Sequence, residues 1–329
     1  MRSVEIHGNT FYNADCIAGA AEHIADDSID LIITDPPYGI RGDRLHRHYN
    51  RNESFVIDGY VEVPAAEYGT FSRRWIQEAE RILRPGGSMY IVSGYTNLYH
   101  ILHALRETSL EEINHIIWKY TFGVYTRRKF VSSHYHILFY EKPGGSRTFN
   151  LESRYGCGER DEAGGSLNYR DREDVWVINR EYKPGRVKNK NELPTDLLCK
   201  MIQYSSNPGD LVCDLFLGGF STARTAIGLD RRATGFELSA PLFEAKTGEL
   251  TDIEPGYLLS TLRTPQTGEG RRRGEPWTPE EIRDVQDRFD RLIASGATKK
   301  RSIEILGEEY GRGRWSIERV LKRDHTGRE

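Results

Sequence analysis

The sequence predicts an α/β fold built on a doubly wound, mostly parallel sheet. Apolar segments of strand length alternate along the chain with amphipathic segments of helical period. The segment SIDLIIT at 28–34 is a nearly continuous apolar run, which is typical of a parallel strand covered on both faces. The chain has 329 residues, so we expect one large domain and one small one.

The first half of the chain supplies most of the expected strands. FYNAD at 11–15 predicts a short strand, and CIAGAAEHIA at 16–25 predicts a helix. The segment 70–83 predicts a second helix with one apolar face, which RPGG at 84–87 is expected to end by turning the chain. The other elements expected here are strands at 88–94, 113–120 and 134–142 and a helix at 97–108.

Regularity fails between residues 143 and 190. Gly, Arg, Asn and Tyr are frequent there, and only DVWVI at 174–178 predicts a strand. An irregular stretch of this length inside a compact domain is usually functional. The α/β pattern then resumes with a helix at 193–206, a strand, glycine turn and helix within 211–229, and a strand at 231–238.

The C-terminal residues predict a separate helical unit. Residues 256–276 are expected to form a linker. Thr278 as N-cap, Pro279 in the first turn and Glu281 at the third helical position then predict a capped helix. Residues 298–323 predict a helix, a glycine turn and a second helix. A helix-turn-helix fits this pattern, and so does a helical cap or dimerisation element.

Composition argues against several classes of protein. No apolar run approaches the roughly 20 residues of a membrane helix, and the N-terminus lacks the apolar core of a signal peptide. The four cysteines form no CxxC pair, which argues against a zinc ribbon or a disulfide framework. We therefore expect no metal, no membrane association and a cytoplasmic location. The net charge of −3 means that any nucleic-acid surface is a local patch.

The strand at 28–34 runs directly into the tetrad DPPY at 35–38. Open α/β sheets bind ligands at the carboxyl ends of their strands. An ionised Asp35 accepts hydrogen bonds, as do the carbonyls of Pro36 and Pro37, whose nitrogens carry no competing donor. Tyr38 adds a flat ring. The tetrad predicts a site that accepts hydrogen bonds from an amino group and stacks on a planar ring, such as an adenine or cytosine held out of a helix.

A second constellation, DLFLGGFST at 214–222, lies between an apolar strand and a helix. Such a turn lets the backbone approach a ligand and directs helix N–H groups toward an anionic group. Glu237 ends the next strand, where an acidic residue typically binds ribose hydroxyls. These residues predict a site for a nucleotide-like cofactor, although a turn that only packs a helix on a sheet has the same pattern.

Together these motifs resemble those of the S-adenosylmethionine-dependent DNA amino-methyltransferases. The catalytic tetrad precedes the cofactor turn, with the irregular stretch between them, an order that resembles the beta class. NADC at 13–16 and the segments EAERILRPGGSMYIV and ELPTDLLCKMIQYSSNPGDLVCD are also similar to that family. The resemblance implies a Rossmann-like methyltransferase domain at 1–255 with a target-recognition region at about 145–190. A small helical, helix-turn-helix-like domain at 277–329 would follow the linker.

The resemblance also implies a role for each motif residue. Asp35, Pro36, Pro37 and Tyr38 would be catalytic, with Asp35 and the Pro36 carbonyl accepting the target amino group and Tyr38 stacking on the base. The implied S-adenosylmethionine site consists of Asp15, Cys16, Asp35, Asp214, Phe216, Gly218, Phe220, Ser221, Thr222 and Glu237. In that site Asp15 and Cys16 would contact the adenine and Glu237 the ribose, while the residues from Asp214 to Thr222 would line the methionine end.

The implied partner is double-stranded DNA with its target base flipped. The target-recognition region would be helped by the polar loop at 41–60 and by TRRKF at 126–130. The cations expected to contact nucleic acid are Arg127, Arg128, Lys129, Arg314, Arg319 and Lys322, and Arg312 is placed on the same C-terminal helix as the last three. A homodimer and a cognate restriction endonuclease stay open as partners. The implied location is the nucleoid-associated cytoplasm of a prokaryotic or virus-infected cell.

The first position of the tetrad predicts the target base. Asp35 resembles the adenine-N6 enzymes more than the cytosine-N4 enzymes. The predicted reaction is therefore transfer of a methyl group from S-adenosylmethionine to the N6 amino group of adenine in a specific DNA sequence, after base flipping. Two alternatives stay open: a cytosine-N4 or RNA methyltransferase, and a weakly active nucleic-acid-binding module. The second is motivated by Phe220, where the family usually has a glycine, and by the C-terminal helical residues.

Overall fold

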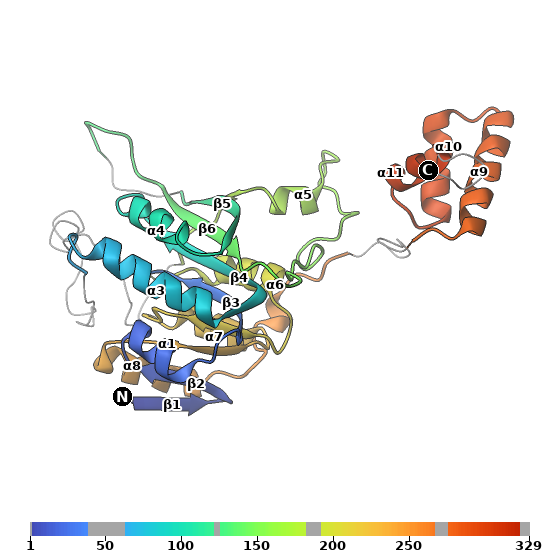
Figure 1. Ribbon diagram of the computed structural model, residues 1–329. Helices are drawn as coiled ribbons and strands as arrows, with labels where there is room; N and C mark the ends of the chain where they lie inside the picture. Colours follow the sequence, from blue (N-terminus) through green and yellow to red (C-terminus); the bar gives the residue numbers. More distant parts are fainter. Residues whose placement is uncertain (1, 39–62, 122–125, 182–191, 267–275, 323–329) are drawn as a thin grey trace. The chain divides into compact units, whose positions relative to one another are not determined.

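A computed structural model describes residues 2–38, 63–121, 126–181, 192–266 and 276–322 (Figure 1). These residues form two compact units. The first contains Met1–Tyr155 and Arg160–Pro265, and the second contains Gly156–Glu159 and Gln266–Glu329. The predicted loop at 41–60 lies outside the described residues.

Within the described part of the first unit, nine strands form one sheet in the order β1-β2-β9-β8-β3-β4-β6-β5-β7. The sheet is mostly parallel, as predicted, and the pairs β1–β2, β4–β6 and β5–β6 are antiparallel. The strands are β1 (Arg2–Ile6), β2 (Asn9–Asn13), β3 (Ile29–Thr34), β4 (Leu83–Ser93), β5 (Glu111–Lys119), β6 (His134–Glu141), β7 (Val175–Val177), β8 (Leu211–Asp214) and β9 (Arg232–Phe236).

Helices cover both faces of this sheet, which explains why β3 buries apolar side chains on both of its faces. Leu31 and Ile33 pack on one face with α6, α7 and α8, while Ile32 packs on the other with α1, α3 and α4. The helices of this unit are α1 (Cys16–His23), α3 (Tyr68–Ile82), α4 (Leu98–Leu105), α5 (Leu167–Asp171), α6 (Thr195–Ser205), α7 (Ser221–Gly228), α8 (Ala240–Thr251) and the short 3-10 helix η2 (Leu259–Thr261).

The sequence patterns miss or misplace four elements. RPGG does not turn the chain, because it lies within β4, which begins at Leu83. The pairing of β4 with β3 shifts its register at these residues. Gly86 makes this possible, since a side chain there would lie 2.5 Å from the Ser146 carbonyl oxygen. The strand β1 and the helices α5 and α8 have no strong periodicity in sequence, and we did not predict them.

The second unit contains three helices within its described residues: α9 (Pro279–Ala294), α10 (Lys299–Glu309) and α11 (Arg314–Leu321). The predicted cap of α9 is present, because the Thr278 side chain accepts the Glu281 N–H and the Glu281 side chain accepts the Thr278 N–H. We expected Arg312 on α11 with the exposed cations, and this prediction is wrong. Arg312 precedes α11 and is buried. Its guanidinium lies 4.6 Å from the centre of the Trp277 ring.

The residues expected to form the linker divide between the units. Leu258 and Leu262 pack against the core of the first unit, and the Leu258 N–H donates to the Gly228 carbonyl at 2.9 Å. Residues 267–275 are outside the described part of the chain. No helix within the described ranges is long and apolar enough to cross a membrane.

Candidate active site and cofactor cavity

A cavity of about 590 Å³ opens at the carboxyl ends of the central parallel strands. The direction in which the chain adds strands reverses between β3 and β8, and open α/β sheets bind ligands at such a switch point. The volume suits a small-molecule ligand. An acidic residue follows or ends each of four neighbouring strands and lines the cavity, namely Asp15 after β2, Glu237 after β9, Asp214 in β8 and Asp35 after β3.

The predicted cofactor turn is folded against two of these carboxyl groups. The Gly218 N–H donates to Glu237 Oε2 at 2.9 Å, and the Phe216 N–H donates to Asp214 Oδ1 at 3.0 Å. The Thr34 hydroxyl, at the end of β3, donates to the same Asp214 oxygen at 3.0 Å. These bonds hold the carboxyl ends of β3, β8 and β9 around one space, so the turn and the tetrad share a cavity.

Burial raises the pKa of three of the lining carboxyl groups. The pKa of Asp35 rises to about 7, that of Asp214 to about 6 and that of Glu237 to about 7, in each case chiefly because the group is removed from water. The Coulomb field of Asp214 raises the pKa of both other groups further. Clusters of acids with raised pKa values are common at functional sites.

The charges around the cavity select for a cationic ligand. The described lining contains the acids Asp15, Asp35, Glu67, Glu192, Asp214 and Glu237, and Arg74 as its cation. A nucleotide with several phosphates would meet this negative surface at a large electrostatic cost. A nucleoside that carries positive charge would instead favour the ionised carboxylates.

The other predicted cofactor residues line the cavity, with one exception. Cys16, Phe216, Gly218, Ser221 and Thr222 all border it. Phe220 does not: its ring is buried in the core, 5.6 Å from the Phe11 ring and 6.0 Å from the Phe243 ring. Its N–H donates to the Leu217 carbonyl at 2.7 Å, so this donor serves the turn.

Asp15 and Cys16 occupy the first turn of α1. Asp15 is the N-cap, and its side chain accepts the N–H groups of Ile17 and Ala18 at 3.1 and 3.0 Å. Burial raises the pKa of the Cys16 thiol, which therefore stays neutral at pH 7. Asp15 thus places the start of α1 at the rim of the cavity.

The tetrad is held by neighbours that the sequence did not identify. The Tyr68 hydroxyl donates to the Pro37 carbonyl at 2.7 Å, and the Asn97 side-chain amide donates to the Tyr38 carbonyl. The Tyr38 hydroxyl donates to Asp35 Oδ1 at 2.6 Å. The described residues donate no hydrogen bond to the Pro36 carbonyl. Asp35 and Pro36 thus keep acceptor positions, while Pro37 serves to fix the backbone.

An arginine and an aromatic group adjoin the tetrad. The Tyr38 ring stacks on Tyr135 of β6, with centroids 5.9 Å apart. Arg180 follows β7, and its guanidinium donates to the Tyr135 hydroxyl at 2.9 Å and lies 5.2 Å from the centre of that ring. Its positive charge lowers the pKa of Asp35, opposing the effect of burial. Residue spacing gives no signal for this pairing, because 45 positions separate Tyr135 and Arg180.

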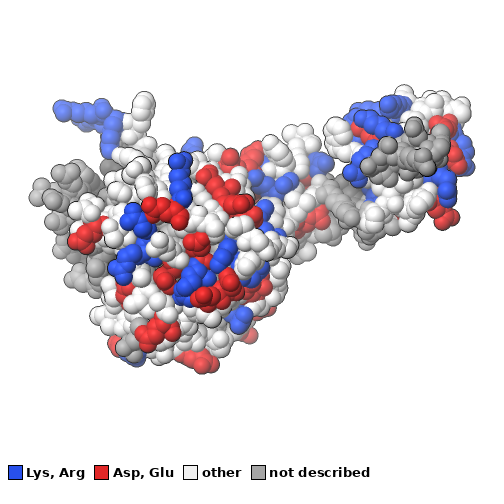
Figure 2. Space-filling model, in the orientation of Figure 1, with Lys and Arg blue, Asp and Glu red and all other residues white. Residues whose placement is uncertain are grey.

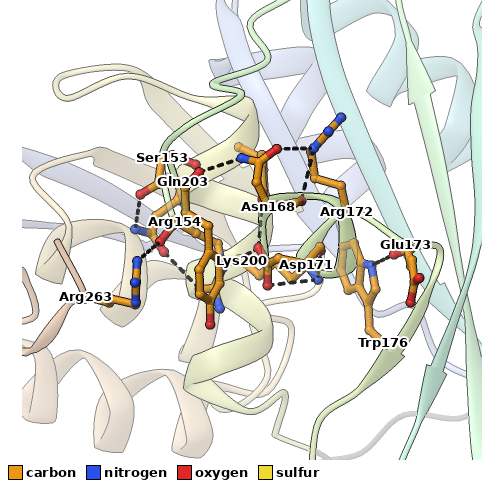
Figure 3. A network of polar contacts seen from close by, with 12 residues as sticks. Ser153, Arg154, Asn168, Asp171, Arg172, Glu173, Trp176, Lys200, Gln203 and Arg263 are labelled. Carbon is orange, nitrogen blue, oxygen red and sulfur yellow. Dashed lines mark hydrogen bonds and ion pairs between the residues drawn. The ribbon is translucent and has the colours of Figure 1, made fainter. Parts of the chain in front are cut away.

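The irregular stretch is tied to α6 by a polar network (Figure 3). Asp171 Oδ2 accepts from Arg154 at 3.0 Å and from the Tyr204 hydroxyl at 2.7 Å, and Asp171 Oδ1 lies 3.5 Å from the Lys200 ammonium. Lys200 lies 4.4 Å from the centre of the Trp176 ring. Burial lowers the pKa of Lys200 to about 8 against the opposing field of Asp171. The network joins residues 154–176 to the helix that precedes the cofactor strand.

The predicted DNA-contacting cations are exposed. Arg127, Arg128 and Lys129 lie on the connection before β6, which projects from the sheet (Figure 1), and the neighbouring Phe130 ring is 98% exposed. Figure 2 shows Lys and Arg atoms at that projection and a mixture of both signs over the rest of the visible face of this unit. Arg314, Arg319 and Lys322 are exposed on or beside α11. Within the described ranges, no group of three or more His, Cys, Asp or Glu side chains could hold a metal ion.

Comparison with known proteins agrees with these motifs. Residues 29–246 match the family model of the N6/N4 DNA methylases. The chain is 28% identical over 260 residues to the type II methyltransferase M.HinfI of Haemophilus influenzae, a match that covers 75% of this chain and 69% of that protein. M.HpaI of Haemophilus parainfluenzae is 28% identical over 241 residues, covering 72% of this chain and 73% of that protein.

Solved structures with the same fold are more distant in sequence. TTHA0409 from Thermus thermophilus, complexed with S-adenosyl-L-methionine, superposes with a TM-score of 0.54 at 22% identity, covering 80% of this chain and 99% of that one. This likeness supports the fold alone. The matched residues 29–246 contain the tetrad, the irregular stretch and the cofactor turn in the predicted order. The chain therefore belongs to the N6/N4 family of DNA methylases.

Proposed function

We propose that this chain transfers a methyl group from S-adenosylmethionine to the N6 amino group of adenine in a specific DNA sequence, with the target base flipped out of the duplex. The observation that carries the proposal is a single acid-lined cavity that joins the DPPY tetrad to the glycine turn. The homodimer and the cognate restriction endonuclease that the resemblance implies stay predictions.

The cavity suits S-adenosylmethionine by charge and by position. When bound, this cofactor supplies an electrophilic methyl group on a positively charged sulfur. The N–H groups of Gly218 and Ser239 each bind one oxygen of Glu237 and fix the carboxylate at the cavity, which supports a role in accepting ribose hydroxyls. Asp214 and Asp35 place negative charge between the turn and the tetrad. These carboxylates attract the positively charged sulfur of the cofactor. The attraction is lost after transfer, because the sulfur of the product is neutral.

The tetrad is arranged to make an exocyclic amine more nucleophilic. The nitrogen lone pair of such an amine is delocalised into the ring. Acceptance of its two N–H groups by Asp35 and the Pro36 carbonyl favours a tetrahedral nitrogen with a localised lone pair. The bond from this nitrogen to the methyl carbon forms as the carbon–sulfur bond breaks, and the surplus proton leaves to Asp35 or solvent. Positioning of the two reactants supplies much of the rate.

The choice of adenine rests on Asp35. A carboxylate in the first position of the tetrad resembles the adenine enzymes, and the family includes cytosine-N4 enzymes as well. To test the choice, the full chain is incubated with methyl-labelled S-adenosylmethionine and mixed-sequence genomic DNA, and the digested nucleosides are separated. We expect label in N6-methyl-2′-deoxyadenosine. Label in N4-methyl-2′-deoxycytidine, or label that appears only when RNA replaces the DNA, would overturn the proposal.

The role of the tetrad is tested by Asp35→Asn. The amide preserves the size of the side chain but removes the carboxylate acceptor, so we expect transfer to fall by roughly 10²–10³-fold. Asp174→Asn, an exposed change beside β7, is the matched control and should transfer normally. Equal activity of Asp35→Asn and the parent would show that the tetrad does not act as proposed.

The role of the carboxylates in cofactor binding is tested by pH. Because the pKa values of Asp35, Asp214 and Glu237 lie between about 6 and 7, these groups bind protons in the empty cavity at pH 6. A cationic ligand favours their ionised forms, so its affinity should rise from pH 5.5 to pH 8 with release of protons. Calorimetry in two buffers of different ionisation enthalpy measures both quantities. Affinity that falls over this range would contradict a carboxylate-lined cofactor site.

A further inference from the structure

The second unit has the element order and the turn length of a helix-turn-helix. The helix α10 ends at Glu309 and α11 begins at Arg314, so the turn is residues 310–313, a length typical of this motif. Gly311 has φ +61°, a conformation that glycine adopts without a steric penalty. The Arg312 N–H donates to the Gly307 carbonyl at 2.9 Å, which closes the turn. Figure 1 shows the three helices of this unit packed together.

Internal packing fixes which face of α11 is turned outward. Ile317 and Val320 are buried against Ile303 and Leu306 of α10 and the apolar face of α9. Two polar bonds fix α11 further: the Trp277 indole donates to the Ser316 hydroxyl at 2.9 Å, and the Gln286 amide donates to the Val320 carbonyl at 3.1 Å. The outward face is therefore a defined surface.

That outward face carries an aromatic ring and two cations in a row. Trp315, Arg319 and Lys322 are exposed and are spaced by four and three residues, so they lie in one stripe along the helix. The Trp315 ring is 82% exposed at the start of α11. Arg314 beside it forms an ion pair with Glu318 at 2.7 Å, so the stripe relies on Arg319 and Lys322 for its charge. In a helix-turn-helix the N-terminal residues of the second helix contact base edges.

The first helix of the motif begins with three exposed cations. Lys299, Lys300 and Arg301 form the start of α10, and its first turn contains no acid. Arg301 forms an ion pair with Glu304 at 3.3 Å, so this start relies on Lys299 and Lys300 for its charge. Positive charge at a helix N-terminus opposes the helix dipole and destabilises the helix. Bound phosphate would reverse this effect, because the cations and the free N–H groups would then contact an anion together. In this motif the first helix crosses the DNA backbone.

The helix outside the motif has the opposite character. Glu280, Asp284 and Asp287 on α9 are spaced by four and three residues and form an acidic stripe. The unit as a whole is nearly neutral, and Figure 2 shows both signs on its visible face. Arg283 and Arg291 are also exposed on α9, but there they lie among these acids, whereas α11 carries a single acid, Glu318. Such a division favours a polyanion that binds these two helices and not α9.

We propose that the second unit is an independent DNA-binding module. Its α11 enters the major groove of duplex DNA with Trp315 at the base edges. Arg319 and Lys322 at the other end of α11, and Lys299 and Lys300 at the start of α10, contact backbone phosphates. This goes beyond methyl transfer, since binding by this unit requires neither the tetrad nor the cofactor. The module adds a second contact with DNA to that made at the catalytic cavity.

The test uses the full chain and mixed-sequence duplex DNA of about three helical turns, in fluorescence anisotropy over a range of salt concentrations. The variant Arg319→Gln/Lys322→Gln should weaken binding roughly tenfold near 0.1 M salt and lower the slope of log K against log salt by about 1 per lost contact. The matched control, Arg283→Gln/Arg291→Gln, removes the same charge from exposed positions on α9 and should change affinity by less than about twofold.

Misfolding of the variants is distinguished from lost DNA contacts by two further measurements. Unfolding temperature and S-adenosylmethionine affinity should match the parent in both double variants. A second variant, Trp315→Ala, should weaken duplex binding without changing the salt slope, since it removes no charge. Equal losses in the α9 control, or no loss in either double variant, would overturn the proposal. The proposal would also be overturned if α11 bound single-stranded RNA more tightly than duplex DNA. It would be overturned as well if the Arg319/Lys322 variant changed only the mass of the protein in sedimentation, since α11 would then act in self-association.

Discussion

Arg180 places a positive charge beside the carboxyl group that the proposed mechanism needs in its ionised form. Its guanidinium is held by the Tyr135 hydroxyl and lies 5.5 Å from the centre of the Tyr120 ring. Burial raises the pKa of Asp35 most strongly, the hydrogen bond from Tyr38 lowers it, and the field of Arg180 lowers it further. We infer that Arg180 is a positioning residue that keeps Asp35 ionised near neutral pH.

Removal of this charge should change the pH profile more than the maximal rate. Below its pKa of about 7 Asp35 is protonated and loses the negative charge with which it accepts an N–H of the target amine, so kcat/KM should fall as the pH falls through 7. In Arg180→Gln the pKa of Asp35 rises, and this limb should move to higher pH. We expect kcat/KM of Arg180→Gln to be roughly three- to tenfold below that of the parent at pH 6. The difference should disappear about two pH units above the pKa of Asp35.

Arg180→Lys is the control for this prediction, because it retains the charge and should restore most of the profile. A structural defect would instead lower the rate of Arg180→Gln equally at all pH values. Steady-state transfer rates between pH 5.5 and 9 distinguish the two results.

At the scale of the element, the turn before α7 explains why a phenylalanine replaces a glycine. Phe220 has φ +58°, in the left-handed region that costs an ordinary residue about 1–2 kcal/mol. Its ring is 1% exposed between Phe11 and Phe243. Burial of such a side chain contributes about 1.5–3 kcal/mol, which offsets the backbone cost. The turn therefore keeps the glycine conformation without a glycine, and its side chain stays out of the cavity.

At Phe220 the glycine variant should consequently be more stable than the alanine variant, the reverse of the order in a helix. Phe220→Ala loses the ring and keeps the unfavourable φ, so the free energy of unfolding should fall by about 3–5 kcal/mol. Phe220→Gly should be more stable than Phe220→Ala by about 1 kcal/mol. The control is Phe243, which is equally buried within α8. There alanine should be the more stable by about 1 kcal/mol, the normal helical order. Urea unfolding of the four variants measures these differences, and the same order at both sites would refute the explanation.

The polar network of Figure 3 makes α6 the support of the irregular stretch. Asp171 joins Arg154 and Lys200, whose side chains are 24% and 7% exposed. Breaking one partner of a buried ionic network leaves charge without compensation. Asp171→Asn should therefore lower the free energy of unfolding by about 3 kcal/mol and lower the pKa of Lys200 further, because the field that opposes its desolvation is lost.

Thermal unfolding and limited proteolysis check this prediction. Cleavage within residues 154–176 should accelerate in Asp171→Asn and not in Asp174→Asn, which changes an exposed carboxylate in the same segment. Unchanged proteolysis would show that the network does not hold the segment in place.

At the scale of the whole molecule, the two units have separate apolar cores. The second unit is built on Ile282, Val285, Ile303, Leu306, Ile317 and Val320, which form a cluster of their own. The cavity lies entirely in residues of the first unit. Ligand binding stabilises only the unit that contains the site.

Calorimetric unfolding of the full chain should accordingly show two transitions. S-adenosylmethionine at about 100 times its dissociation constant should stabilise the first unit by about 2.7 kcal/mol and leave the other transition unchanged. All three described helices of the second unit follow residue 277, so truncation before this residue should remove the unaffected transition. A single transition that shifts as a whole would show that the units unfold together.

The sequence by itself determined the parallel sheet and the family, and it singled out the tetrad and the glycine turn that border one cavity. It could do so because the apolar run, the tetrad and the glycine turn are local patterns whose chemistry depends on neighbours in the chain. It also predicted the N-terminal cap of α9 and the two helices that follow, because these signals depend on residues a few positions apart.

Tertiary structure alone decided how these pieces share one cavity. The pKa values of Asp35, Asp214 and Glu237 depend on burial and mutual distance, which arise only when β3, β8 and β9 lie side by side. The contact of Arg180 with Tyr135 joins residues from two distant strands, so no local pattern could identify it. The outward turn of Trp315 and the inward turn of Arg312 were likewise decided by packing, because three helices must bury one apolar face together.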